Sequence, residues 1–111
     1  MLFTCAEDFF EKSLQRGRLS REEEKTLFLR MKAGDASAHE RMVESYLVIV
    51  AATIKRLPKE HQSLDLIYHC VQALEQSVDK FDFLQDGEAF LHRLSLVLRG
   101  EITKHIAKQG S

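Results

Sequence analysis

The stretch SLDLIYHCVQALEQSVDKFDF, residues 63–83, decides the fold that the sequence predicts. Its apolar residues recur in steps of three and four, which is the spacing of a helix with one buried face. Ser63 occupies the position of an N-cap, and Asp65 adds a negative charge to the first turn, where the helix dipole favours it. The stretch therefore predicts an amphipathic helix with a polar outer face. Its apolar stripe consists of Ile67, Cys70, Val71, Leu74, Val78 and Phe81.

Two further helices are predicted before this stretch. Ser20 and Glu23 have the spacing of a capping box, and Gly34 ends the helix that they start. Asp35 then caps a long helix that runs to about Leu57. This long helix carries a wide apolar face, which is typical of the central helix of a bundle. The face consists of Met42, Val43, Tyr46, Leu47, Ile49, Val50, Thr53 and Ile54.

The two ends of the chain complete the helical pattern. A short apolar edge predicts a helix over residues 6–14. An Asp-Gly turn within residues 84–88 leads into a final helix over residues 88–108. Gly100 lies inside that helix, where glycine costs about 1 kcal/mol relative to alanine, and we interpret it as a sign of close packing. The prediction is an all-α fold, a four- to five-helix bundle.

Length and composition set the outer bounds. A chain of 111 residues suggests one domain with a sizeable core. The net charge of −1 points to no charged partner, so any basic surface must be local. No apolar run reaches the roughly 18 residues of a membrane span, and the N-terminus lacks the pattern of a signal peptide. We therefore expect a cytoplasmic protein without membrane contact.

Two side chains invite more than one interpretation. Cys70 lies on the apolar stripe of residues 63–83 and is interpreted as a small buried hydrophobe, with a reactive role as the alternative. Tyr46 is interpreted as a core residue whose hydroxyl reaches the rim of the core, with a binding role as the alternative. The chain has only two cysteines, which is too few for a disulfide framework.

The sequence offers no catalytic or metal-binding motif. The five histidines show neither an HExxH pattern nor paired metal spacing. His69 and Cys70 are adjacent on a helix and so point to different faces. Residues 22–24 are three glutamates at a capped helix start rather than an acid-base pair. We therefore expect no enzyme, no metal and no cofactor.

A resemblance to a known family rests on three stretches. Asp65-Leu66-Ile67, Leu74 and residues 78–82, VDKFD, resemble the second conserved region of bacterial sigma-70-type transcription initiation factors, which reads close to DLIQEGxxGLxxAVDKFD. Residues 19–50 resemble the helices that precede this region, and residues 98–106, LRGEITKHI, resemble an I-x-G-E-I stretch of sporulation and stress-type sigma factors. The resemblance implies a region 2 domain over residues 19–107, with residues 1–18 as an N-terminal extension that contains a short helix.

The resemblance implies a protein partner. In the family, the outer face of the region 2 helix docks on the clamp helices of the largest subunit of core RNA polymerase. At Tyr68-His69-Cys70 this chain departs from the family's Gln-Glu-Gly, which is part of that contact. The implied polymerase-binding residues are Asp65, Tyr68, His69, Gln72, Glu75, Gln76 and Asp79.

The last helix departs further from the family. There it carries aromatic side chains that capture flipped bases when the promoter opens, and base stacking contributes roughly 1 to 3 kcal/mol per base. Here only Phe90 remains, and we interpret it as a core residue. Leu91, His92, Arg93, Leu96 and Val97 stand at the other positions. The basic residues are read either as a solvated face or as a phosphate-contacting strip. They are Arg93, Arg99, Lys104 and Lys108.

Two hypotheses of function follow. The first is a sigma-70-like initiation factor that binds core RNA polymerase, with a second chain supplying the DNA-reading region that this sequence lacks. The alternative is a degenerate sigma-like interaction module or mobile-element regulator that binds polymerase or another protein without melting promoter DNA. In either case we expect promoter DNA to be bound weakly, since phosphate contacts bind without reading sequence.

Overall fold

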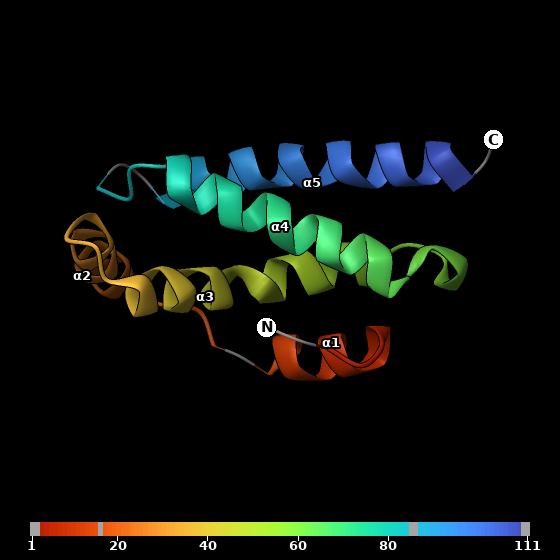
Figure 1. Ribbon diagram of the computed structural model, residues 1–111, viewed down its shortest axis with the longest axis horizontal. Helices are drawn as coiled ribbons and strands as arrows, with labels where there is room; N and C mark the ends of the chain where they lie inside the picture. Colours follow the sequence, from red (N-terminus) through yellow and green to blue (C-terminus); the bar gives the residue numbers. More distant parts are fainter. Residues whose placement is uncertain (1–2, 16, 85–86, 110–111) are drawn as a thin grey trace.

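Five α-helices and one short 3₁₀-helix form the computed structural model, which describes residues 3–15, 17–84 and 87–109. No strand occurs in those ranges, so the all-α prediction is confirmed. Of the predicted Asp-Gly turn over residues 84–88, residues 85 and 86 lie outside the described residues, and Gly87 is the first residue of the last helix. The elements in chain order are α1 (Ala6–Leu14), α2 (Arg21–Lys32), α3 (Ala36–Lys55), η1 (Lys59–His61), α4 (Leu64–Lys80) and α5 (Gly87–Gln109) (Figure 1).

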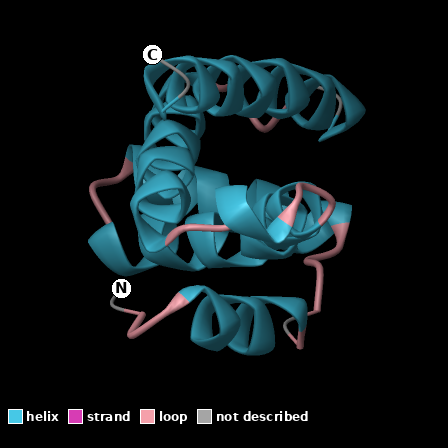
Figure 2. Ribbon diagram, turned by 90° about the vertical axis from the view of Figure 1, so that its right-hand side faces the viewer, coloured by secondary structure: helices cyan, strands magenta, loops and turns pink. Residues whose placement is uncertain are grey.

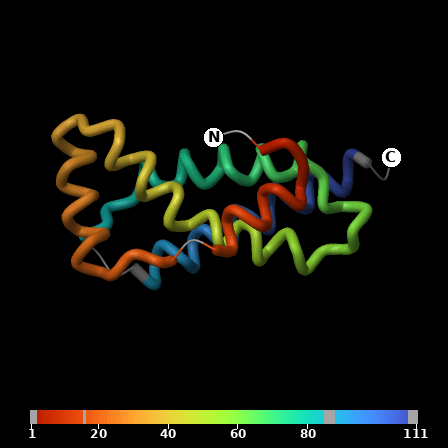
Figure 3. The backbone as a smooth tube through the Cα atoms, turned by 90° about the horizontal axis from the view of Figure 1, so that it is seen from below, coloured from red at the N-terminus to blue at the C-terminus, as the bar shows by residue number. Residues whose placement is uncertain are grey.

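Helix α3 lies at the centre of the bundle. Helices α1, α2 and α4 all pack against it, whereas α5 packs mainly on α4. Figure 2 shows the result as layers, with α5 and α1 on opposite sides of the centre. Helix α2 stands across one end of the bundle, beside the chain that links α4 to α5 (Figure 3). No helix within the described part of the chain is both long and apolar enough to span a membrane.

The predicted caps start the three helices that build the site. Ser20 and Glu23 form the complete capping box, with each side chain accepting a hydrogen bond from the other residue's backbone N–H at 3.1 and 3.0 Å. Ser63 Oγ accepts from the Leu66 N–H at 3.2 Å at the start of α4. The carboxylate of Asp35 accepts from two backbone N–H groups in the first turn of α3. Local hydrogen bonding therefore sets where each helix begins.

Helix α4 ends three residues earlier than the predicted stretch. Phe81 is extended rather than helical, so residues 81–84 alternate between core and solvent. Phe81 and Phe83 are buried, and their rings pack 5.1 and 4.8 Å from the ring of Phe90. The Phe90 ring also contacts Tyr46 at 4.7 Å and is fully buried. This aromatic cluster confirms the core interpretation of Phe90 and anchors the start of α5 to α3.

The environment of Tyr46 differs from the prediction. The residue is in the core as expected, but its hydroxyl does not reach the rim, because it donates a hydrogen bond to the buried carboxylate of Glu24. The guanidinium of Arg18 lies 4.6 Å from the Tyr46 ring centre. Burial, and then the Glu24 hydrogen bond, raise the pKa of the Tyr46 hydroxyl well above its usual range. Burial also raises the pKa of the Cys70 thiol to about 12, and that residue is fully buried as predicted.

We expect Tyr46→Phe to lower the free energy of unfolding by about 1 to 3 kcal/mol, because it leaves a buried carboxylate without its donor. Since folding raises the pKa of Tyr46, its contribution is fully present below pH 10 and is lost as the pH rises further. The difference in the free energy of unfolding between the wild type and Tyr46→Phe should therefore become smaller in alkaline buffer. Urea unfolding at several pH values measures this difference. A difference in the free energy of unfolding between wild type and variant that does not change with pH would contradict the role assigned to Glu24.

Gly100 does not mark close packing, so that interpretation was wrong. A Cβ built on Gly100 meets no atom within 4 Å, and the residue is exposed on the outer side of α5. Glycine therefore only weakens the helix at this position.

We expect Gly100→Ala to raise the free energy of unfolding by up to about 1 kcal/mol, since alanine has the better helix propensity and meets open space. Gly34→Ala is the matched control. Gly34 has a φ of +93°, which strains any residue with a Cβ, so this change should destabilise the protein. Thermal unfolding monitored by circular dichroism measures both, and a lower melting temperature for Gly100→Ala would contradict the open environment.

Candidate functional site

The outer face of α4 is open to solvent over most of its length. The apolar stripe of α4 is buried against α3 and α5, which leaves the polar stripe outward. Six of the seven residues that the resemblance implied for polymerase binding are exposed on this face. They are Asp65, His69, Gln72, Glu75, Gln76 and Asp79, and we call them the α4 face.

Tyr68, the seventh residue, is only half-buried and is engaged within the protein. Its hydroxyl accepts a hydrogen bond from the Phe3 N–H at 2.9 Å and donates to the Phe3 carbonyl at 3.2 Å. The buried Phe3 ring also packs edge-on against Phe9 of α1, with ring centres 4.9 Å apart. Tyr68 therefore joins the N-terminal segment to α4 at the border of the α4 face.

The departure from the family motif is smaller on the surface than in the sequence. Of Tyr68-His69-Cys70, Cys70 points into the core and Tyr68 holds Phe3, so only His69 is exposed. His69 Nε2 lies 3.6 Å from Asp65 Oδ1, and the largely buried His105 of α5 lies 3.7 Å from the other oxygen of Asp65. The amino-terminal end of the α4 face is thus set by a contact between α4 and α5.

The opposite end of the α4 face includes a residue that sequence reasoning missed. His39, in the first turn of α3, places Nε2 2.7 Å from Asp79 Oδ1, at ion-pair distance but without hydrogen-bond geometry. Beside this contact, α3 and α4 enclose a cavity of about 600 Å³ with Glu40 and Glu75 in its wall. No lysine or arginine lines it among the described residues, so this part of the surface is acidic. The sequence alone could not suggest the pairing of His39 with Asp79, because it depends on how α3 packs against α4.

The four basic residues of α5 are all exposed but do not form one strip. Arg99 lies about 120° away from Arg93 around the helix, whereas Lys104 and Lys108 lie within about 60° of Arg93. Arg93 instead shares a cavity of about 450 Å³ with Lys80 of α4. DNA binding by these residues stays a prediction, and the α4 to α5 junction is where two cations come together.

Among its described side chains, helix α5 presents no phenylalanine, tyrosine or tryptophan ring to solvent, although the imidazole of His92 is exposed. Phe90 is the only aromatic residue in its sequence besides the histidines, and it belongs to the buried cluster. Leu96 is more than half exposed and Val97 is partly exposed, and neither can stack on a base. Apart from Phe90, the aromatic residues that the resemblance implies for base capture are therefore absent from α5.

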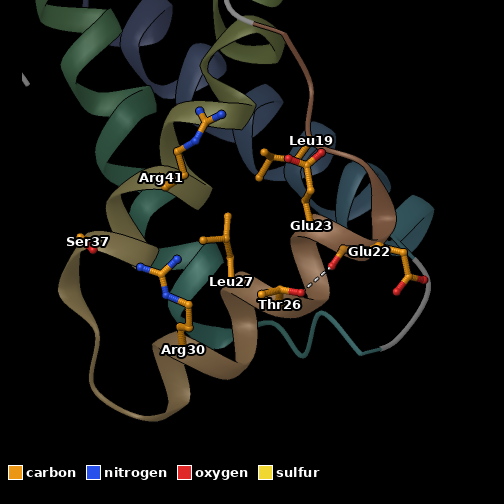
Figure 4. Close-up of a pocket in the computed structure, with 8 residues that line it drawn as sticks. All are labelled: Leu19, Glu22, Glu23, Thr26, Leu27, Arg30, Ser37 and Arg41. Atoms are coloured by element: carbon orange, nitrogen blue, oxygen red, sulfur yellow. Dashed lines mark hydrogen bonds between the residues drawn. The ribbon is translucent and has the colours of Figure 1, made fainter.

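A third cavity, of about 580 Å³, lies between α2 and α3 (Figure 4). Its charged groups neutralise one another: Arg30 pairs with Asp35 at 2.7 Å, and Arg41 on α3 attracts Glu23. The Ser37 hydroxyl, followed by Arg30, lowers the pKa of Asp35 to about 2. Glu23 and Asp35 also accept hydrogen bonds from backbone N–H groups at the starts of α2 and α3. Within the described ranges, no group of three or more His, Cys, Asp or Glu could hold a metal ion.

Comparison with known proteins shows what this chain is similar to. It is 38% identical to RNA polymerase sigma factor SigA of Clostridium acetobutylicum over 92 residues, which are 82% of this chain and 24% of SigA. It is 29% identical to a protein of Bacillus thuringiensis subsp. kurstaki named "Putative RNA polymerase sigma-G factor" over 90 residues, which are 79% of this chain and 70% of that protein. No protein-family model and no solved structure matches the chain.

These relatives confirm the resemblance to sigma-70-type RNA polymerase sigma factors, which covers about four fifths of the chain. The chain spans about a quarter of the length of SigA.

Proposed function

We propose that this chain acts as a sigma-type transcription factor that binds core RNA polymerase through the α4 face. The observation that carries the proposal is the exposure of six of the seven implied contact residues on one side of one helix. Helix α4 is held at both ends, by the Ser63 cap and by the aromatic cluster that follows it. Its outer face therefore needs little ordering when a partner binds, which favours affinity.

The charge of the α4 face supports a basic partner surface. Asp65, Glu75 and Asp79 are exposed along it, and Glu40 adds a further carboxylate from α3. Complementary charge speeds association and suppresses wrong partners, and its effect falls as salt screens it. We propose the clamp helices of the largest polymerase subunit as that basic surface, following the family resemblance.

Binding of the wild-type chain to purified core RNA polymerase tests the proposal directly. We expect a complex at low ionic strength whose affinity falls as salt is added. Surface-immobilised polymerase with the chain in solution gives both affinity and rates. The proposal fails if no complex forms even at low salt, where electrostatic association is strongest.

A second candidate function is an interaction module that occupies polymerase without opening promoters. It is favoured by the absence of an exposed phenylalanine, tyrosine or tryptophan among the described side chains of α5, since Phe90 is buried. In the split-factor form of the first proposal, a second chain would supply the DNA-reading region. In the interaction-module form, polymerase or another protein is bound and DNA contributes little.

A further inference from the structure

Two exposed leucines line one cavity at the carboxyl end of α4. Leu29 of α2 is 58% exposed and Leu84, after α4, is 51% exposed, although both are large apolar side chains. They line one cavity of about 300 Å³ between α2 and the end of α4. Its other lining residues are Phe28, Lys32, Asp79, Lys80, Phe81 and Asp82. Exposed apolar side chains that gather around a cavity mark interaction sites more often than scattered ones do.

The backbone holds Leu84 outward. Phe83 is buried beneath it, and the Asp82 carboxylate accepts a hydrogen bond from the Leu84 N–H at 2.9 Å. On α2, Leu29 follows the buried Phe28, so the helix directs it away from the core. Both leucines are thus presented by ordered elements whose adjacent side chains are already packed. A partner would gain their apolar contact without first ordering the chain.

The cavity is continuous with the α4 face. Asp79 belongs to both, because it lies on the polar stripe of α4 and also lines the cavity. The charges at the rim of the cavity balance, because Lys32 and Lys80 offset Asp79 and Asp82. The α4 face is acidic, whereas the cavity is apolar with a neutral rim. A partner that covers both must therefore place basic side chains against the α4 face and an apolar side chain in the cavity.

We propose that this cavity receives a large aliphatic or aromatic side chain of core RNA polymerase, the partner of the α4 face. The inference rests on the proposed function and adds the apolar anchor to it. Buried apolar anchors carry most of the affinity of an interface, whereas exposed charges mainly set association rate and salt dependence. Leu29 and Leu84 pack against this polymerase side chain, and Glu75 and Asp79 attract the basic side chains beside it.

The test is the double variant Leu29→Ser/Leu84→Ser in binding to core RNA polymerase. We expect its affinity to fall at least about tenfold, mainly through faster dissociation, with an unchanged salt dependence. Leu96→Ser is the matched control, since Leu96 is 54% exposed on α5, away from the cavity, and it should bind like the wild type. Circular dichroism verifies the helices, and Leu84→Ser alone, outside any helix, replaces the double variant if α2 is disturbed.

The outcomes distinguish binding through the cavity from binding through the α4 face. If the wild type binds polymerase and the double variant binds equally well, the cavity is not the anchor site while the α4 face stands. If the wild type does not bind, both proposals are overturned. If the leucine changes leave polymerase binding intact but abolish a wild-type dimer in analytical ultracentrifugation, the occupant is a second copy of the chain and the inference is wrong.

Discussion

The paired change Glu75→Lys/Asp79→Lys is expected to weaken binding to core RNA polymerase by about a hundredfold or more at low salt. Both carboxylates are exposed on the α4 face, and each reversal replaces an attraction for a basic surface by a repulsion. A like-charge contact in an interface costs several kcal/mol, and about 1.4 kcal/mol is a tenfold change in affinity. Asp79→Lys also removes the contact with His39 that holds this end of the face.

Folding should survive these reversals. Neither carboxylate is buried, and a cation near the carboxyl end of a helix is favourable to the helix dipole. The matched control is Glu7→Lys/Glu11→Lys, which makes the same charge change on exposed positions of α1, on the other side of α3. The loss of polymerase affinity caused by Glu75→Lys/Asp79→Lys should become smaller as the salt concentration is raised. Equal binding by both double variants would show that net charge, and not the α4 face, governs the association.

The second large effect is an absence of promoter opening. With core RNA polymerase and this chain as the only factor, permanganate should detect no reactive thymines in a defined bubble. Opening requires unstacked bases to be captured, and extruding a base costs a few kcal/mol. Phe90, the one phenylalanine of α5, is enclosed by Tyr46, Phe81 and Phe83, so it cannot reach a base without unfolding the core.

A complete sigma factor on the same template provides the positive control. Any DNA retained by this chain should be bound without sequence preference and released steeply by salt, since only phosphate contacts remain. Lys80 and Arg93, which share one cavity, are the strongest candidates for such contacts. A reproducible bubble formed by the wild-type chain would show that α5 captures bases in some other way, and the interaction-module proposal would then lose its support.

Much of the fold followed from local rules. The capping residues Ser20, Asp35 and Ser63 start helices because a side-chain oxygen reaches backbone N–H groups only two or three residues away. Apolar spacing predicted the buried stripe of α4, and with it the exposed polar residues on the opposite side. Residues 81–83 escaped this reasoning, because they leave the helix and bury Phe81 and Phe83 in the core.

What the sequence by itself determined is therefore the set of helices, their starts, and which face of each is apolar, since these depend on neighbours within a turn or two. Only the tertiary structure decided which faces meet. Glu24 belongs to a run of acidic residues at a helix start, yet packing of α2 on α3 buries it against Tyr46. Likewise, tertiary packing brings His39 to Asp79 and places Leu29 and Leu84 around one cavity, and no local pattern encodes such pairings because each partner alone looks like an ordinary surface residue.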